Sequence, residues 1–244
     1  MPPNELLTHY GPAFYQGVNH PSLRSGQVVM PLILDLLKPA SAVDVGCGQG
    51  EWLSVAASYG VEVLGVDGPH VADEQLLIPK DRFIRQDLSQ PLKFDRQFDL
   101  AMSLEVGEHL PAAACAEFVA TLTRLAPAVV FSAALPGQGG VHHINEQWPW
   151  YWRELFERRG YVRLDAFRRA IWQNPEVAYY YQQNLYLFVD PEVHKGLIDR
   201  IGVPDKLSEL TLVKTTILQD MLRQGLLRRG VRKIARLFGG SDSR

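Results

Sequence analysis

The stretch that decides the fold is residues 44–50, "DVGCGQG". It follows a short apolar run, residues 41–46 "SAVDVG", and precedes residues 51–60 "EWLSVAASYG", which read as a helix ended by Gly60. Glycines are expected between a strand and a helix where the backbone must turn tightly and let a ligand approach without a Cβ in the way. The turn therefore predicts a ligand-binding loop, but the glycines alone do not specify the ligand, because nicotinamide and flavin proteins use similar glycines.

Strand-like and helix-like segments alternate on both sides of this turn. The expected strands after the first one are 61–67 "VEVLGVD", 82–87 "RFIRQD", 98–104 "FDLAMSL" and 127–133 "PAVVFSA". Short apolar strands separated by helices indicate an α/β fold, with a parallel sheet covered on both faces. Helices are expected over 26–37 before the sheet and 149–159 after it. The two segments 161–172 and 178–190 predict an antiparallel hairpin at the end of the sheet.

The bulk composition is that of an ordinary globular protein. The chain has 244 residues, of which 46% are apolar and 21% charged, and its net charge is −2. That balance gives no reason to expect a nucleic-acid partner. Cys47 and Cys115 are too few for a disulfide scaffold, the start of the chain lacks a secretory signal, and no apolar run reaches the ~20 residues that span a bilayer. We expect a cytoplasmic protein without a transmembrane segment.

Three regions are expected along the chain. Residues 1–38 form an N-terminal helical or lid segment, 39–190 the cofactor-binding domain, and 191–244 a helical, basic tail. Within the tail, residues 221–238 carry six Lys or Arg and no acid at roughly helical spacing. This tail either contacts a membrane surface, a polyanion or a partner, or docks as a solvated helix on its own domain; the second interpretation is favoured. The oligomeric state is not indicated.

The glycine turn resembles motif I of the class I S-adenosylmethionine (SAM) methyltransferases, with an acid two residues before the first glycine. The resemblance covers about residues 25–190 and implies a Rossmann-like, seven-stranded, mostly parallel sheet with an antiparallel last strand and helices on both faces. It also implies a ribose-binding acid at Asp67 and an adenine-side carboxylate at Asp87, since a carboxylate accepts the hydrogen bonds that the cofactor donates. The cofactor-binding residues expected on this basis are Asp44, Gly46, Cys47, Gly48, Gly50, Asp67, Asp87, Leu88 and Leu104.

The second informative stretch is residues 105–111, "EVGEHLP", after the fourth strand. The resemblance implies that this stretch lies beside the methylsulfonium of the cofactor. The E-x-x-E-H pattern resembles two subgroups of the superfamily, the metal-dependent small-RNA 2′-O-methyltransferases and the O-methyltransferases of ubiquinone biosynthesis. In the first subgroup these residues and a downstream histidine bind a divalent ion. Carried over, the metal ligands are Glu105, Glu108, His109 and one of His142 or His143, with His143 chosen. Such a set suits Mn, Fe, Co or Zn at least as well as Mg.

Other interpretations of the same residues remain open. His142 or His143 can act as a general base without an ion, and Glu108 and His109 can simply begin a helix. The metal site is favoured over the metal-free acid/base site, and both over a structural role. The candidate catalytic residues are His143, His142, Glu105 and Glu108.

The loop after the fifth strand is the expected wall of the acceptor pocket. Gly137, Gly139 and Gly140 suit a lid, and Asn145, Glu146 and Gln147 could bind a polyhydroxylated acceptor. The aromatic residues that follow are expected to divide between core and pocket: Trp148, Trp150, Tyr151 and Trp152. Tyr15 and Arg24 are further candidates from the N-terminal segment.

The function predicted from these features is that of a SAM-dependent O-methyltransferase, which acts on a hydroxyl of a sugar or small-molecule (natural-product or polysaccharide) acceptor, with or without assistance from a divalent metal ion. The alternatives are a metal-independent N- or C-methyltransferase with a histidine base, and a SAM-binding scaffold subunit without catalysis. RNA ribose methylation ranks lower because no RNA-binding module is recognisable and the chain is slightly acidic.

Overall fold

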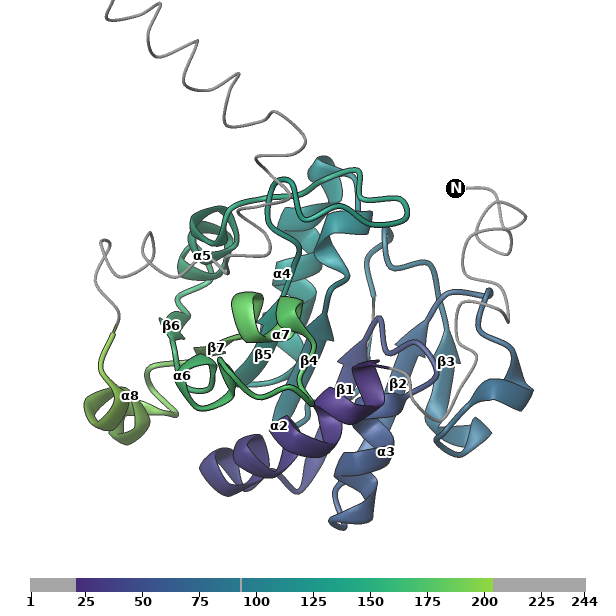
Figure 1. The fold of residues 1–244 in the computed structure, drawn as a ribbon, viewed down its shortest axis with the longest axis horizontal. Helices are drawn as coiled ribbons and strands as arrows, with labels where there is room; N and C mark the ends of the chain where they lie inside the picture. The colour runs from purple at the N-terminus through teal and green to yellow at the C-terminus, as the bar shows by residue number, and fades with distance from the viewer. Residues whose placement is uncertain (1–20, 93, 204–244) are drawn as a thin grey trace, which may run out of the picture.

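The computed structural model describes residues 21–92 and 94–203, which fold around one seven-stranded sheet (Figure 1). The strand order is β3-β2-β1-β4-β5-β7-β6. The strands are β1 Ser41–Val45, β2 Glu62–Asp67, β3 Phe83–Arg85, β4 Leu100–Leu104, β5 Ala128–Ser132, β6 Val162–Leu164 and β7 Tyr186–Val189.

The pairing directions divide the sheet into two parts. The strands from β3 to β5 are parallel, so their carboxyl ends lie at one edge of the sheet. The last strand, β7, is antiparallel to both of its neighbours, β5 and β6. The predicted fold class is therefore confirmed, including the antiparallel last strand. In such sheets ligands bind beyond the carboxyl ends of the parallel strands, where the glycine turn lies here.

Helices cover both faces of this sheet (Figure 1). The α-helices are α2 Pro21–Leu37, α3 Glu51–Ser58, α4 Cys115–Leu125, α5 Pro149–Glu157, α6 Arg168–Ile171, α7 Tyr179–Asn184 and α8 Lys195–Ile201. Short 3-10 turns occupy η1 Asp73–Gln75, η2 Lys80–Arg82, η3 Gly107–His109 and η4 Ala112–Ala114.

Two apolar layers hold these helices on the sheet. Residues of α2, α3, α6 and α7 pack on one face with Ala42 and Met102, and residues of α4 and α5 pack on the other with Val43 and Phe131. Ala42 and Val43 are neighbours in β1 that point to opposite faces, and both are fully buried. Burial on both faces explains why the central strands read as continuous apolar runs.

The segment between residues 161 and 190 differs from the expected hairpin. Its two strands do pair, but they are only three and four residues long, and α6 and α7 lie between them. The aromatic residues 179–181 favour a strand by propensity, yet the burial of Tyr181 against Trp52, at a ring separation of 5.0 Å, favours a helix there.

Some expectations concern residues that the structure does not describe. Tyr15, the first twenty residues of the lid segment and the basic stretch 221–238 lie outside the described residues. Within residues 21–92 and 94–203, no helix has the length and apolar character that crossing a bilayer requires.

Candidate functional site

The glycine turn has the backbone geometry that its sequence predicts. Gly46, Gly48 and Gly50 have φ values of 90°, 56° and 85°, a region that other residues adopt only with strain. A Cβ on Gly46 would lie 2.3 Å from a methyl group of Val106. The turn after β1 is thus in direct contact with the turn after β4, and only glycine fits between them.

A buried acid lies directly below this turn. Asp44 is 3% exposed, and burial together with Asp67 and Glu51 raises the pKa of its carboxyl group to about 8. Burial likewise raises the pKa of Glu51 to about 7. Asp44 in β1, Glu51 at the start of α3 and Asp67 at the end of β2 thus lie around the glycine turn, and a cofactor with a sulfonium and an ammonium group would favour their ionised forms.

Asp67 ends β2 and connects two loops. One carboxylate oxygen accepts a hydrogen bond from the backbone amide of Gly48 at 2.6 Å, and the other accepts one from Gly68, also at 2.6 Å. His70 lies 3.5 Å from the same carboxylate. Burial raises the pKa of Asp67, and His70 and the two amides oppose that rise. The predicted ribose acid is therefore positioned beside the glycine turn.

The remaining predicted cofactor residues are distributed around the same edge of the sheet. Asp87 follows β3, is exposed, and accepts hydrogen bonds from the backbone amide and hydroxyl of Ser89 at 2.9 and 2.7 Å. Leu104 is buried at the end of β4, and Cys47 is buried within the glycine turn. Leu88 packs at the edge of the apolar layer that contains Val43. Their contacts with the cofactor stay a prediction.

Three of the predicted metal ligands meet at the turn after β4. Glu108, His109 and His143 each offer one ligand atom, and these atoms lie within 4.8 Å of one another. Nε2 of His143 lies 4.0 Å from Oε1 of Glu108. The η3 turn presents the first two side chains, and backbone amides of Ile144 and Asn145 donate to the Glu108 carbonyl at 3.0 and 2.9 Å, which brings His143 over that turn.

The carboxylate of Glu108 is the most unusual group in this cluster. It is fully buried, and neither of its oxygens accepts a hydrogen bond from the residues that the structure describes. Burial, reinforced by Glu105, raises its pKa well above the usual range, although backbone amides of Glu108 and Ala134 lie near enough to oppose the rise. A buried carboxylate whose nearest donors are too poorly placed for regular hydrogen bonds is costly unless it is protonated or bound to a cation. It therefore fits a divalent ion well.

His109 is suited to the same role. Its Nδ1 donates to the backbone carbonyl of His142 at 3.2 Å, which leaves Nε2 as the unprotonated nitrogen of the neutral ring. Burial, and then His143, lowers the pKa of His109 to about 4. A neutral imidazole oriented by a carbonyl is the usual state of a histidine ligand.

Glu105 lies outside this three-residue cluster. Its carboxylate accepts hydrogen bonds from the side-chain amides of Gln138 at 2.8 Å and Asn184 at 3.2 Å, and its backbone φ is 57°. Burial raises its pKa, and the amide of Gln138 is the largest opposing influence. The structure therefore places Glu105 beside the cluster, within reach of its electrostatic influence, and not among its three ligands.

His142 contributes its backbone more than its ring. Its carbonyl orients His109, its φ is 57°, and its imidazole is not part of the three-residue cluster. Of the two adjacent histidines, His143 is the one that faces Glu108, so the predicted choice between them favours His143.

Sequence reasoning missed the roles of three polar residues around the site. Gln138 and Asn184 hold Glu105, and Asn184 also donates to Gln138 at 2.9 Å. Glu146, which the sequence suggests as an acceptor contact, instead accepts hydrogen bonds from the backbone amides of Gly137 and Gly139 and from His143. The one sequence feature that could have predicted the contact between Glu146 and His143 is their spacing of three residues.

Of the other residues expected to contact the acceptor, some are buried inside the protein and others are at its surface. Asn145 is 6% exposed and donates to Cys115 Sγ at 3.1 Å, and Gln147 donates to Asn145 at 2.9 Å, so both stabilise the loop itself. Trp152 is buried, whereas Trp150 is 48% exposed. Trp148 and Tyr151 are half-buried. The aromatic run thus serves partly the core and partly the surface. Arg24 forms an ion pair with Glu176 at 3.7 Å.

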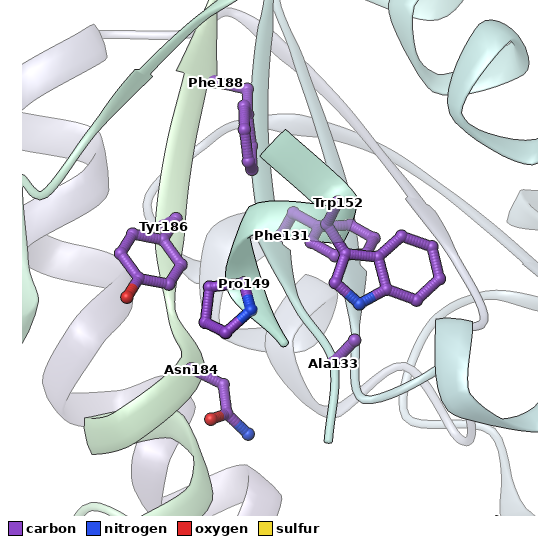
Figure 2. A pocket seen from close by; sticks show the side chains of 7 residues that line it. All are labelled: Phe131, Ala133, Pro149, Trp152, Asn184, Tyr186 and Phe188. Carbon is purple, nitrogen blue, oxygen red and sulfur yellow. The ribbon is translucent and has the colours of Figure 1, made fainter. Parts of the chain in front are cut away.

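A small cavity lies behind Asn184 (Figure 2). Its volume is about 10 Å³, which is room for one water molecule and far too little for an acceptor. It is lined by Phe131, Ala133, Pro149, Trp152, Asn184, Tyr186 and Phe188. Figure 2 shows aromatic side chains from β5, β7 and α5 around it, so it belongs to the core and not to the acceptor pocket.

Comparison with known families and sequences gives two matches. A family model described as "Methyltransferase domain" matches residues 23–174. A protein of Oryza sativa subsp. japonica named "Probable tocopherol O-methyltransferase, chloroplastic" is 40% identical over an alignment of 99 residues, which covers 36% of this chain and 26% of that protein. The chain thus spans about a quarter of the length of that relative.

Solved structures share the fold at low sequence identity. Streptomyces venezuelae DesVI matches with a TM-score of 0.52 and 14% identity, over 72% of this chain and 95% of that one. The magnesium protoporphyrin IX methyltransferase ChlM of Synechocystis PCC 6803, solved with bound SAH, matches with a TM-score of 0.51 and 20% identity, over 70% and 84% of the two chains. The matched family model covers the glycine turn and the Glu108 cluster together.

Proposed function

The chain belongs to the class I SAM-dependent methyltransferases, and we propose that it transfers the methyl group of SAM to a hydroxyl oxygen of a sugar or other small hydroxylated acceptor. The observation that carries this proposal is the contact between Gly46 and Val106, which sets the cluster of Glu108, His109 and His143 directly beside the cofactor turn. With SAM bound at that turn, an acceptor oxygen held at this cluster would be close to the transferable methyl group.

The chemistry of methyl transfer explains why such a cluster is useful. The acceptor oxygen attacks the methyl carbon as the bond to sulfur breaks, so the transition state requires an in-line arrangement and an oxygen that has lost, or is losing, its proton. A hydroxyl group needs help because its pKa lies well above neutrality. Groups that lower that pKa or accept the proton must therefore contact the acceptor.

In the favoured mechanism, Glu108, His109 and His143 would hold a divalent ion. A bound ion of this kind would lower the pKa of an acceptor hydroxyl and orient two vicinal oxygens. The donor set of one carboxylate and two imidazoles suits Mn, Fe, Co or Zn at least as well as Mg. Glu105, whose carboxylate lies beside the cluster, adds negative charge that favours a cation there.

The metal-free mechanism uses the same side chains differently. Nε2 of His143 accepts the hydroxyl proton, and Glu108 stabilises the resulting imidazolium at 4.0 Å. This arrangement also serves a nitrogen or carbon acceptor, which is the second candidate function. The identity with a relative named as an O-methyltransferase supports the oxygen acceptor.

The surface of the loop that carries His143 supports an acceptor with an apolar face. Val141 and Ile144 flank the two histidines and are 45% and 58% exposed, and Trp150, in the first turn of α5, is 48% exposed. Aromatic and aliphatic surfaces of this kind pack against sugar rings and phenols alike.

Turnover of labelled SAM with a panel of glycosides and phenols tests the enzyme. Transfer to an oxygen supports the proposal. Transfer to nitrogen or carbon would support the second candidate, and intact SAM binding with no transfer to any member would support a scaffold without catalysis. Full activity of a demonstrably metal-free preparation, prepared with EDTA and compared with metal add-back, would remove the ion from the mechanism.

The two adjacent histidines provide a matched pair of variants. His143→Ala should lower kcat/KM by roughly 100-fold or more, since it removes a ligand or base. His142→Asn should retain most activity because asparagine tolerates the left-handed backbone that residue 142 adopts. Equal losses in both variants would contradict this assignment.

A further inference from the structure

The carboxylate of Glu146 connects the lid loop to His143. Its Oε2 accepts a hydrogen bond from the backbone amide of Gly137 at 2.6 Å, and its Oε1 accepts one from the amide of Gly139 at 2.7 Å. The same Oε1 lies 3.0 Å from Nδ1 of His143. The Glu146 side chain is only 18% exposed, so water competes little for these contacts.

These contacts determine which nitrogen of His143 carries the proton. An ionised carboxylate only accepts hydrogen bonds, so Nδ1 must be the donor in this pair. The neutral ring then has its lone pair on Nε2, the nitrogen that lies 4.0 Å from Glu108. Both mechanisms proposed above need that lone pair, whether His143 binds an ion or accepts a proton.

The loop also confines the imidazole ring by direct packing. A Cβ on Gly140 would lie 2.2 Å from Nε2 and 2.5 Å from Cε1 of His143, so the backbone of Gly140 passes close against the ring. His109 contacts the ring on another side, with 4.9 Å between the ring centres. Glu146 binds the backbone amides on both sides of Gln138. The same carboxylate therefore holds both the His143 ring and the loop backbone that packs against it.

We propose that Glu146 is a positioning residue, which holds His143 in the Nδ1-protonated tautomer with Nε2 directed at Glu108 and secures residues 137–140 against the ring. The competing interpretation is a carboxylate that only caps loop amides. The proposal depends on the proposed function only for the role of His143 in the reaction, as an ion ligand or as a base. The tautomer is a property of the protein without cofactor, ion or acceptor, so it can be tested independently.

The deciding measurement is ¹⁵N NMR of the histidine side chains in apo protein at mildly alkaline pH, with His143 assigned by its absence in His143→Gln. We expect His143 to show a protonated Nδ1 and an unprotonated Nε2 in the unsubstituted protein. A protonated Nε2 would overturn the proposal, and this spectrum decides the question even if a variant fails to fold.

Variants of Glu146 separate positioning from loop capping. Glu146→Leu removes the acceptor of the Nδ1 proton, so His143 should shift toward the Nε2-protonated tautomer. Glu146→Gln and Glu146→Asp each keep an oxygen that can accept from Nδ1 and should retain the original tautomer. The matched control is Glu157→Leu, at an exposed acid 3.4 Å from Arg153 in α5, and it should leave the His143 signals unchanged. The same tautomer in Glu146→Leu and in the unsubstituted protein would contradict the proposal.

Ion binding gives a second measurement that does not depend on turnover. Titration of apo protein with Mn²⁺ or Zn²⁺ should show affinity about 10–100-fold weaker in Glu146→Leu, the usual effect of losing a group that orients a histidine ligand. SAM affinity should stay within about twofold, since Glu146 lies on the acceptor side. If the unsubstituted protein binds neither ion, the metal mechanism of the proposed function fails, and the NMR result still decides the role of Glu146.

Discussion

Oε2 of Glu105 accepts a hydrogen bond of 2.8 Å from the side-chain amide of Gln138, which joins the end of β4 to the loop after β5. Asn184, at the end of α7, donates to both partners. Residues from three separated parts of the chain thus fix one buried carboxylate beside the Glu108 cluster. The loop over the acceptor site is therefore fastened to the sheet by polar contacts as well as by packing.

Replacing Gln138 by leucine should destabilise the protein. The change removes one donor from a buried carboxylate, and an unsatisfied acceptor of this kind costs about 1–3 kcal/mol. Urea denaturation measures the effect, with Gln90→Leu as the control, since Gln90 is exposed and its amide reaches Ser89 at 3.4 Å. Equal stability of Gln138→Leu and Gln90→Leu would show that Glu105 does not depend on this donor.

Replacing Glu108 by methionine should stabilise the apo protein while it abolishes methyl transfer. Burial raises the folded-state pKa of Glu108 above its value in the unfolded chain, so the folded state holds the proton more tightly and stability falls as pH rises through and above the ordinary carboxyl range. An apolar side chain lacks that penalty and should raise the free energy of unfolding by about 1–3 kcal/mol at pH ~8.

The control for that variant is Glu117→Met. Glu117 is an exposed acid that pairs with Arg124 at 2.7 Å, and its replacement should change stability by no more than about 0.5 kcal/mol. If Glu108→Met is less stable than the unsubstituted protein when both are measured without ions, the prediction is wrong. The Glu108 carboxylate would then have adequate hydrogen-bond partners in the apo state.

Asp44 should make stability depend on pH between about 4 and 8. Its folded-state pKa is about 8, against 3.8 as the ordinary value, so the folded state binds the extra proton and the free energy of unfolding decreases across that window. One such group contributes a slope of at most about 1.4 kcal/mol per pH unit. Asp44→Asn should flatten the profile, although Glu51, with a pKa of about 7, retains part of it. Asp95→Asn, at a position nearer the surface, is the control.

Gly46→Ala should weaken SAM binding by at least about tenfold, or about 1.4 kcal/mol. The new methyl group would lie 2.3 Å from Val106 and would displace either the cofactor turn or the turn that carries Glu108. Gly60→Ala is a closely matched control because Gly60 has a similar φ, 84°, but a Cβ at that position would meet no atom within 4 Å. Isothermal titration with SAM compares them. Recovery of binding in Gly46→Ala with Val106→Ala would identify this contact as the cause.

The sequence predicts most of the sheet because each buried strand is an apolar run that ends near an acid or a glycine. Strand ends at Asp67 and Leu104 agree with the structure for this reason. The prediction fails over residues 168–184, where two short helices replace expected strand. Their side chains are helical because of where they pack, as Tyr181 against Trp52 shows, and packing partners this far apart in the chain cannot be inferred from local propensity.

The candidate site likewise has residues that the sequence predicts and residues that it does not. Glu108, His109 and His143 follow from a motif and a nearby histidine pair, and the structure brings them together. The partners of Glu105 do not follow, because Asn184 lies 79 residues away in a segment with the pattern of a strand. Hydrogen bonds between distant loops depend on the completed fold, whereas residue types at strand ends depend on local sequence.

The order of strands at the sheet's edge has a consequence for synthesis of the protein. β6 precedes β7 in the chain, yet among the described strands it pairs only with β7, which itself pairs with β5. Residues 162–164 therefore have no place in the sheet until residues 186–189 have left the ribosome and docked on β5. The emerging chain carries an unfinished edge at β5 for the length of this delay, a natural point for chaperones to act.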